Sequence, residues 1–325
     1  MSEELANKLI SRDRKSEHHH EQHVEKCLHR ADYFIRNVDV TEKINASVER
    51  FIKLVHGTNR ITPTNDEIGL YSAQSAALQS ACLSRQVGAS IMDDDGNILS
   101  TGCNDVPKSG GGLYNAESNK DLRCYNMGGG QCYNDLHKSH LELEFENILA
   151  EFKIENRAEI AKRLLEESKA KSIIEYSRAI HAEMAAIMAM ARSSTNSTIS
   201  KTLYCTTYPC HNCARHIVAS GIKRVVYIEP YEKSLALDLH SDSICHPESG
   251  NSEGKVLFEN FEGVSPKRYT KFFGFHSPRK DGKGKAIFTS IVDSYHVDTQ
   301  YLDGYVDYEL KVVGTVEDKV PELRD

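Results

Sequence analysis

The chain contains the sequence SRAIHAE at residues 177–183 and the sequence YPCHNC at residues 208–213. A helix is expected to begin within each stretch, because an Ala-rich run follows His181 and because Pro209 suits a change from extended chain to helix. Together the two stretches supply one histidine and two cysteines, which are metal ligands, and one glutamate. We therefore expect the fold to be organised around a metal site at two helix N-termini.

The ligand types predict zinc. His181 offers a neutral imidazole, and the i, i+3 spacing lets one helical turn present the thiolates of Cys210 and Cys213. A helix N-terminus favours a thiolate, although the metal itself has the larger effect. A catalytic zinc site keeps three protein ligands and leaves one position for water, whereas a structural site closes with four ligands.

Glu183 distinguishes a catalytic site from a structural one. A structural site needs no free carboxylate, whereas a glutamate beside a metal-activated water can take its proton and return protons to the substrate. The order H-x-E followed by P-C-x-x-C is the known signature of zinc-dependent nucleobase deaminases. The alternative is a structural zinc module in which Glu183 lies nearby by coincidence.

The flanking sequence predicts an α/β fold of three layers, α/β/α, with a mixed central sheet. The turn DDDG at residues 93–96 is a strong hairpin signal. The expected elements are a helix in 63–82, strands at 86–91 and 97–102, the helix after His181, a strand at 202–206, the helix from Cys210 to Gly221 and a strand at 224–229. Residues 255–258 and 286–292 are also strand-like.

Three segments follow from this pattern: a helical N-terminal extension at residues 1–60, the zinc-site domain at 61–300 with a charged insert at 109–176, and a C-terminal tail at 301–325. Parts of the extension resemble the closing segment of P-loop nucleotide-kinase-like domains, although the chain has no G-x-x-x-x-G-K-[ST] motif. In the tail, Val312, Val313 and Val316 are the only hint of a strand.

Composition excludes several functions. The 325 residues carry a formal net charge of -7 and no long basic stretch, so a long nucleic acid is not expected as a substrate. No apolar run approaches the roughly 20 residues that cross a bilayer, and no signal peptide is evident, so we expect a cytoplasmic protein without membrane contact. Nine cysteines in such a chain indicate free thiols and metal ligands.

Several motifs carry a resemblance to a known family. They are SRQVGA at 84–89, GCNDVP at 102–107, HAE at 181–183, TTYPCHNC at 206–213 and GIKRVVY at 221–227. With them the chain resembles the deoxycytidylate deaminase branch of the cytidine-deaminase superfamily. It is most similar to bacterial antiphage dCTP deaminases, through NDVPK at 104–108 with the glycines at 110–112, and EPYEKS at 229–234 running on to LHSD at 239–242. The resemblance covers about residues 62–295.

The resemblance implies a cytidine-deaminase-like fold and hydrolytic deamination of deoxycytidine nucleotides, with dCTP and also dCMP as substrates. The implied role is depletion of dCTP in antiphage defence. One alternative is a housekeeping dCMP deaminase that supplies dUMP for thymidylate synthesis, and another is a non-catalytic, zinc-stabilised nucleotide-binding module. The resemblance also implies a homo-oligomer and an RNA or protein inhibitor. Mg²⁺ carried by a nucleoside triphosphate is a further candidate cofactor.

The same resemblance names substrate-binding candidates. Asn104 corresponds to an asparagine that contacts the sugar hydroxyl and the base, with a simple turn asparagine as the alternative. The remaining candidates bind phosphate or stack on the nucleotide, and ordinary turn or packing roles stay open for each of them. They are Arg85, Lys108, the backbone of Gly110–Gly112, Tyr231 and Lys233.

The insert suggests a second metal site. Cys124, Cys132, His137 and His140 lie within 17 residues, and each has ligand chemistry. Relatives in the deoxycytidylate deaminase branch sometimes hold a structural zinc in this region. The spacing C-x7-C-x4-H-x2-H matches no standard zinc finger, so the alternative is a polar insert whose cysteines are simply buried.

Overall fold

The structure is a computed structural model, and it describes residue 5 and residues 27–37, 40–57, 60–193, 197–249, 253–275, 278–289 and 304–319. The chain divides into two compact units, which are residues 1–36 with 63–267, and residues 37–62 with 268–325. The first unit contains both sequence motifs that predict the metal site. The domain boundaries expected from the sequence, at residues 60 and 300, stay predictions.

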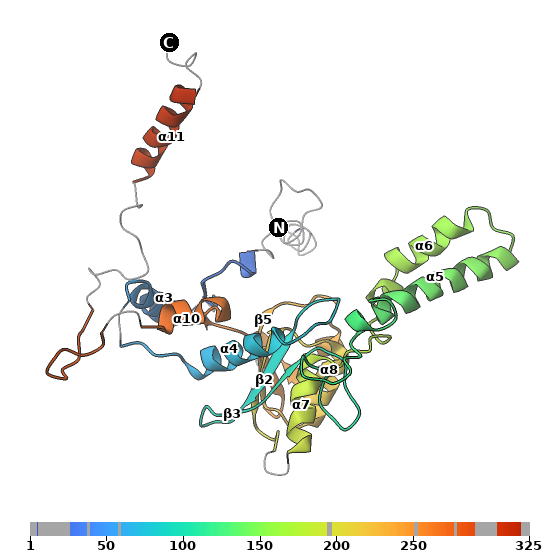
Figure 1. The fold of residues 1–325 in the computed structure, drawn as a ribbon, viewed down its shortest axis with the longest axis horizontal. Coiled ribbons are helices and arrows are strands. Elements are labelled where there is room, and N and C mark those ends of the chain that lie inside the picture. The colour runs from blue at the N-terminus through green and yellow to red at the C-terminus, as the bar shows by residue number, and fades with distance from the viewer. Residues whose placement is uncertain are drawn as a thin grey trace. The chain divides into compact units, whose positions relative to one another are not determined.

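A six-stranded sheet forms the centre of the first unit, with the order β3-β2-β4-β5-β7-β6 (Figure 1). Strand β2 is antiparallel to both of its neighbours, β3 and β4, whereas β4, β5, β7 and β6 run parallel. The sheet is therefore mixed, as predicted. The strands are β2 (Gly88–Met92), β3 (Ile98–Cys103), β4 (Thr202–Thr207), β5 (Arg224–Glu229), β6 (Ile244–Cys245) and β7 (Val256–Asn260).

Helices cover both faces of this sheet, which confirms the three-layer α/β/α prediction. Along β4, Leu203 and Cys205 pack into one core with α7 (Ala182–Arg192) and α8 (His211–Ala219). Tyr204 points to the opposite face and packs with Leu70 of α4 (Asn65–Ala77). This alternation is the two-residue period of a strand that is buried on both faces.

Helix α4 begins where the sequence predicts, and a capping box fixes its start. The Thr64 hydroxyl accepts a hydrogen bond from the Glu67 amide at 3.2 Å, and the Glu67 carboxylate accepts one from the Thr64 amide at 2.7 Å. Glu67 is only 1% exposed, and its other oxygen accepts a hydrogen bond from Val264 of β8 (Gly263–Val264) at 2.8 Å. Strand β8 pairs with β1 (Tyr33–Phe34) in a small antiparallel sheet, so Glu67 ties α4 to that sheet.

The predicted β2–β3 hairpin is present. Gly96 has a φ of +86°, a value that favours glycine, and its amide donates to the Asp93 carbonyl at 3.2 Å. The Asp93 carboxylate accepts a hydrogen bond from the Asn97 amide at 2.9 Å. The hairpin places Asn104, the residue after β3, at the end of the strand nearest the zinc motifs.

The insert forms a pair of helices, α5 (Tyr133–Glu151) and α6 (Arg157–Glu167), which pack on each other (Figure 1). The charged insert expected from the sequence thus contains two helices, and the first of them begins at Tyr133. Short helical turns flank the pair, and a few more complete the first unit. They are η1 (Cys124–Asn126), η2 (Lys169–Ser172), α9 (Ala236–Leu239), η3 (Pro247–Ser249) and η4 (Pro266–Arg268).

The second unit contains α3 (Thr41–Val55), α10 (Tyr269–Phe273) and α11 (Tyr305–Lys319). The strand hint in the tail was wrong, because Val312 and Val313 lie within helix α11. Of the strand-like residues 286–292, only Ala286 makes a bridge, to Lys280, and residues 290–292 lie outside the described residues. Residues 1–4 and 6–26 of the predicted N-terminal extension also lie outside them. No helix among the described residues is long and apolar enough to span a bilayer.

Candidate active site

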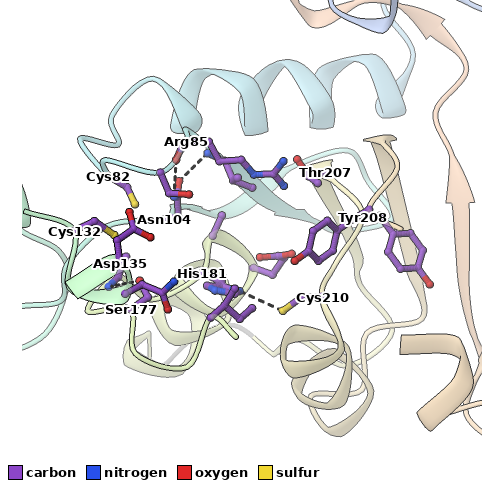
Figure 2. A pocket seen from close by; sticks show the side chains of 18 residues that line it. Cys82, Arg85, Asn104, Cys132, Asp135, Ser177, His181, Thr207, Tyr208 and Cys210 are labelled. Atoms are coloured by element: carbon purple, nitrogen blue, oxygen red, sulfur yellow. Dashed lines mark hydrogen bonds between the residues drawn. The ribbon is translucent and has the colours of Figure 1, made fainter. Parts of the chain in front are cut away.

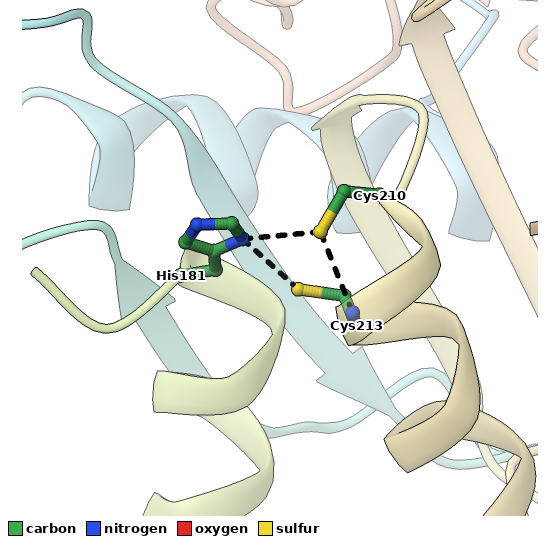
Figure 3. Close-up of side chains that lie close together, drawn as sticks. All are labelled: His181, Cys210 and Cys213. Carbon is green, nitrogen blue, oxygen red and sulfur yellow. Dashed lines mark hydrogen bonds between the residues drawn. The ribbon is translucent and has the colours of Figure 1, made fainter. Parts of the chain in front are cut away.

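The two sequence motifs meet at the N-termini of α7 and α8. His181 is the N-cap residue of α7, Cys210 is the N-cap residue of α8, and Cys213 lies in the first turn of α8. The Nδ1 atom of His181 is 3.3 Å from each cysteine sulfur, and the three ligand atoms all lie within 4.8 Å of one another (Figure 3). Ordinary Zn–S and Zn–N bond lengths at a tetrahedral angle place such ligand atoms about 3.5 Å apart. The donor set and its spacing therefore fit a zinc ion.

The two thiols differ in proton affinity. A hydrogen bond from Cys213, with another from His181, lowers the pKa of Cys210 to about 4. The pKa of Cys213 is raised, because Cys213 shares that hydrogen bond and is buried. Zinc ligands must be deprotonated, so metal binding releases the proton that the pair retains.

Glu183 is the second residue of α7 and is only 4% exposed. Its Oε2 atom lies 3.4 Å from the Cys213 sulfur. Burial raises the pKa of Glu183, since a low-dielectric surrounding disfavours the charged carboxylate. A carboxyl group with a raised pKa is suited to exchange protons near neutral pH.

A cavity of about 370 Å³ opens beside these residues (Figure 2). His181, Glu183 and Cys210 line it, and so do three of the predicted substrate-binding residues, Asn104, Arg85 and Tyr231. The volume lies in the usual range for a small-molecule site. The remaining lining residues are Cys82, Ser84, Val87, Cys132, Asn134, Asp135, Ile174, Ser177, Ala179, Ala182, Thr207 and Tyr208.

Asn104 holds one wall of this cavity in place. Its Oδ1 atom accepts a hydrogen bond from the Val87 amide at 2.7 Å, and its Nδ2 atom donates to the Arg85 carbonyl at 2.7 Å (Figure 2). The guanidinium of Arg85 lies 5.8 Å from the ring centroid of Tyr231, a cation–π distance. Arg85 is the only lysine or arginine among the described residues that line the cavity, so it is the one permanent cation of that set.

Two predicted substrate contacts do not line this cavity, namely Lys108 with its glycine loop and Lys233. The loop closes on itself, because the Lys108 amide donates to the Gly112 carbonyl at 3.0 Å and the Gly111 amide donates to the Lys108 carbonyl at 3.1 Å. These two amides donate their hydrogen bonds within the turn, so neither is available to bind a phosphate group. The positive φ angles of its glycines serve the turn itself.

The predicted second metal site is not assembled. Within the described parts of the chain, His181, Cys210 and Cys213 form the only group of three ligand side chains close enough to share an ion. Cys124 and Cys132 line a small cavity together with Cys82, but His137 and His140 do not. Both histidines lie farther along α5, where the His137 ring packs on Tyr176 with centroids 5.3 Å apart.

Sequence reasoning missed Tyr208 as a wall of the cavity. Its hydroxyl lies 3.4 Å from Nε2 of His246, whose Nδ1 lies 3.0 Å from the Phe258 carbonyl oxygen. Its ring meets the Tyr227 ring edge to face at 4.8 Å. Burial raises the pKa of Tyr208 to about 12, so the phenol stays protonated. The position of Tyr208 immediately before Pro209 and Cys210 was the signal that could have identified it.

The two ends of the segment that contains the α5–α6 helix pair were also missed as cavity walls. Cys132, Asn134 and Asp135 at the start of α5, and Ile174 after η2, line the cavity. No local pattern marks these residues as cavity residues, because their place depends on how the insert folds back.

Comparison with known proteins matches residues 63–229 to the cytidine and deoxycytidylate deaminase zinc-binding region. The deoxycytidylate deaminase of Enterobacteria phage T2 is 31% identical over 166 residues, which are 51% of this chain and 80% of that protein. The enzyme of the same name from Enterobacteria phage T4 is 33% identical over 171 residues, with 51% and 78% covered.

Among solved structures, the dCMP deaminase of cyanophage S-TIM5 in complex with dCMP and dUMP is similar at 20% identity. The match covers 62% of this chain and all of that one, with a TM-score of 0.37. The family match spans more than half of the chain and includes His181, Glu183, Cys210 and Cys213. The chain therefore belongs to the cytidine and deoxycytidylate deaminase family.

Proposed function

We propose that the chain is a zinc-dependent enzyme that hydrolyses deoxycytidine nucleotides to deoxyuridine nucleotides and ammonia, with dCTP as a substrate and dCMP as a second one. One observation carries the proposal. The buried carboxyl group of Glu183 lies beside the ligand set of His181, Cys210 and Cys213, and Glu183 lines one cavity together with His181 and Cys210. A structural zinc site has no use for a buried carboxyl group at this position.

The chain's own residues have distinct roles in this mechanism. When bound, a zinc ion with three protein ligands lowers the pKa of a water molecule and so supplies a nucleophile near neutral pH. Glu183 would take the two protons of this water in turn, and would pass the first to N3 of the cytosine ring and the second to the departing amine. The new C–O bond replaces the C–N bond at C4, so cytosine and water become uracil and ammonia.

The cavity supplies substrate contacts beyond the reacting carbon. Arg85 can bind a phosphate group, because a guanidinium donates paired hydrogen bonds to such an anion. Asn104 fixes the backbone on both sides of Gln86 and so helps to position Arg85. The aromatic walls formed by Tyr208 and Tyr231 give the base and sugar apolar surface to pack on.

The number of phosphate groups on the substrate distinguishes two versions of the proposed function. Resemblance at residues 104–112 and 229–242 favours dCTP, with dCTP depletion in antiphage defence as the role. The alternative, a dCMP deaminase that supplies dUMP for thymidylate synthesis, is favoured by a different observation. Within the described part of the chain, Arg85 is the only lysine or arginine that lines the cavity, and one guanidinium matches one phosphate group better than three.

Ammonia release from purified, zinc-loaded protein tests the proposal. The chain is incubated with dCMP, dCDP, dCTP and CTP, with and without Mg²⁺. We expect release from dCTP and dCMP, whereas turnover of dCMP alone would assign the thymidylate role. Glu183→Gln should lower release by at least about 10²-fold with zinc still bound. Unchanged release from that variant contradicts the mechanism, and zinc binding with no release by the unaltered chain indicates a binding module.

A further inference from the structure

Asp105 is a buried residue that joins three segments of the cavity wall. It follows Asn104 directly and is only 1% exposed. Its Oδ2 atom accepts a hydrogen bond from the Ala81 amide at 2.9 Å, and its carbonyl oxygen accepts one from the Ile180 amide at 3.0 Å. Ala81 and Ile180 each precede a residue that lines the cavity, and the residue after Ile180 is the proposed ligand His181. Asp105 therefore fixes the chain immediately before His181 relative to the chain at Asn104.

In the described part of the chain, the carboxylate of Asp105 has one cationic partner, and it comes from the insert. The Nη1 atom of Arg123, the residue before η1, lies 3.6 Å from Oδ2 of Asp105. The Nε and Nη2 atoms of Arg123 donate to the Asp121 carboxylate at 2.9 and 2.6 Å, so the guanidinium bridges two carboxylates. The side chains of Arg123 and Asp105 are 14% and 2% exposed. Since a buried carboxylate without a partner is strongly unfavourable, the position of Asp105 depends on Arg123.

A second arginine binds the same part of the insert in return. Arg178 lies in the motif that contains the proposed histidine ligand, and its Nη1 atom donates to the Leu122 carbonyl at 2.9 Å. The contacts form a closed path that runs from Asp105 to Arg123 and Leu122, on to Arg178, along the chain to Ile180, and back to Asp105. A closed path fixes the relative positions of its members more firmly than a single contact does, because no member can rotate away alone.

Resting on the proposed function, we propose that Arg123 is a positioning residue for the zinc site. Arg123 does not line the cavity, so it touches neither the metal nor the substrate. It neutralises the carboxylate of Asp105, and Asp105 in turn holds the chain before His181. Groups that hold a metal ligand in place typically contribute about 10- to 100-fold to metal affinity or to activity. The insert therefore acts on the proposed catalytic centre through one guanidinium.

The zinc Kd tests this role without turnover. Competition between the full-length, zinc-loaded protein and a chromophoric chelator measures that Kd, and ammonia release per bound zinc is measured beside it. We expect Arg123→Met to weaken zinc binding about tenfold and to slow ammonia release by a similar factor. In an Asp105→Asn background the same change should cost less than about twofold, because the carboxylate that Arg123 neutralises is absent. No loss in the unaltered background, or an equal loss in both backgrounds, overturns the proposal.

Arg163→Met is the matched control. Arg163 lies in α6 of the same insert, and its Nε atom lies 2.9 Å from the exposed Glu167 carboxylate. Removal of this pair leaves Asp105 and its contacts intact, so the zinc Kd and ammonia release should stay within about twofold of the unaltered chain. A tenfold loss in Arg163→Met would show that any lost ion pair of the insert weakens the site, and would overturn the role of Arg123.

Arg123→Lys keeps the proposal testable if Arg123→Met does not fold. Lysine keeps the charge but has one ammonium group in place of the guanidinium fork, so it cannot bind Asp121 and Asp105 in the same way. It should weaken zinc binding about threefold, and an unchanged zinc Kd overturns the proposal. Weaker zinc binding in the variants of a chain that releases no ammonia when unaltered would refute the proposed function and leave the role of Arg123 intact. Ammonia release from the unaltered chain with an unchanged zinc Kd in the variants refutes the role of Arg123 alone.

Discussion

The contact between β3 and α7 sets the position of the proposed catalytic centre, and Gly102→Ala perturbs it directly. A Cβ atom on Gly102 would overlap the Ala182 carbonyl oxygen and the Ala186 amide nitrogen, and would lie 2.9 Å from the Ala185 carbonyl carbon. Real Cβ atoms essentially never lie within 3.0 Å of such atoms, so α7 must move away from the sheet by at least about 0.5 Å. Helix α7 carries His181 and Glu183 at its N-terminus.

The expected losses of stability and of reaction rate follow from this shift of α7. Overpacking of a core typically costs about 1–3 kcal/mol of the free energy of unfolding. A misplacement of about 1 Å can lower the rate of an enzyme about 10²-fold. For Gly102→Ala we expect unfolding stability to fall in that range, and ammonia release per bound zinc to fall about 10- to 100-fold.

Gly88→Ala is the matched control on the other face of the sheet. A Cβ atom there would overlap the Ala73 carbonyl oxygen of α4 and would lie 2.5 Å from the Ala77 amide nitrogen. Its stability cost should be similar, about 1–3 kcal/mol, with release per zinc within about threefold of the unaltered chain. Thermal unfolding, zinc content and ammonia release measure both variants. Equal rate losses in the two, or full activity in Gly102→Ala, would refute the argument.

Three further predictions concern the metal, the phosphate and the core. Chelation of zinc should abolish ammonia release. Added zinc should restore ammonia release in the unaltered chain but not in Cys213→Ala. Full activity after chelation would contradict a zinc-dependent enzyme. Arg85→Ala should weaken nucleotide binding about 10- to 100-fold while hardly changing binding of deoxycytidine, and an equal loss for the nucleoside would exclude a phosphate contact. Arg224→Met should lower the free energy of unfolding by about 2 kcal/mol, because it removes the guanidinium that pairs with both Asp66 and Glu259 and leaves Glu259 with Arg36 alone. An unchanged urea midpoint would show that the ion pairs of Arg224 do not stabilise the core.

The clustering of the proposed zinc ligands could be predicted from sequence because short-range geometry determines most of their arrangement. Cys210 and Cys213 are one helical turn apart, so any helix that begins at Cys210 brings both sulfurs to one side. His181 and Glu183 likewise share the start of α7. Only the meeting of the two helix N-termini needed the whole fold, and the α/β order of the elements already implied a sheet that could bring them together.

The tail was harder to predict because its apolar residues suit two structures. Val312 and Val313 favour strands by propensity, yet Tyr305, Tyr308 and Val312 recur at intervals of three and four residues, which is a helical period. All three side chains are exposed in the described structure. They therefore do not alternate between buried and exposed positions, as the side chains of a half-buried strand would. The period was the better signal here.

The residues that line the cavity were the least predictable, because packing between segments far apart in the sequence decides which side chains lie in its wall. Lys108 and its glycines had the composition of an anion-binding loop, but the turn uses two of its own amides internally. Asn134 had no sequence signal, and it reaches the cavity only because the insert folds back to Ile173. Ligand chemistry can be read from a motif, whereas a cavity wall is assembled from distant segments.

Asn104 shows how this difference affects the assignment of roles. By resemblance it contacts the sugar hydroxyl, yet both ends of its amide already hold the backbone at Arg85 and Val87. Each end keeps one further hydrogen-bonding position, so a sugar contact would be added to the structural role. Loss of activity on replacing Asn104 would therefore not identify a sugar contact, because the same change releases Arg85, the only lysine or arginine among the described residues that line the cavity.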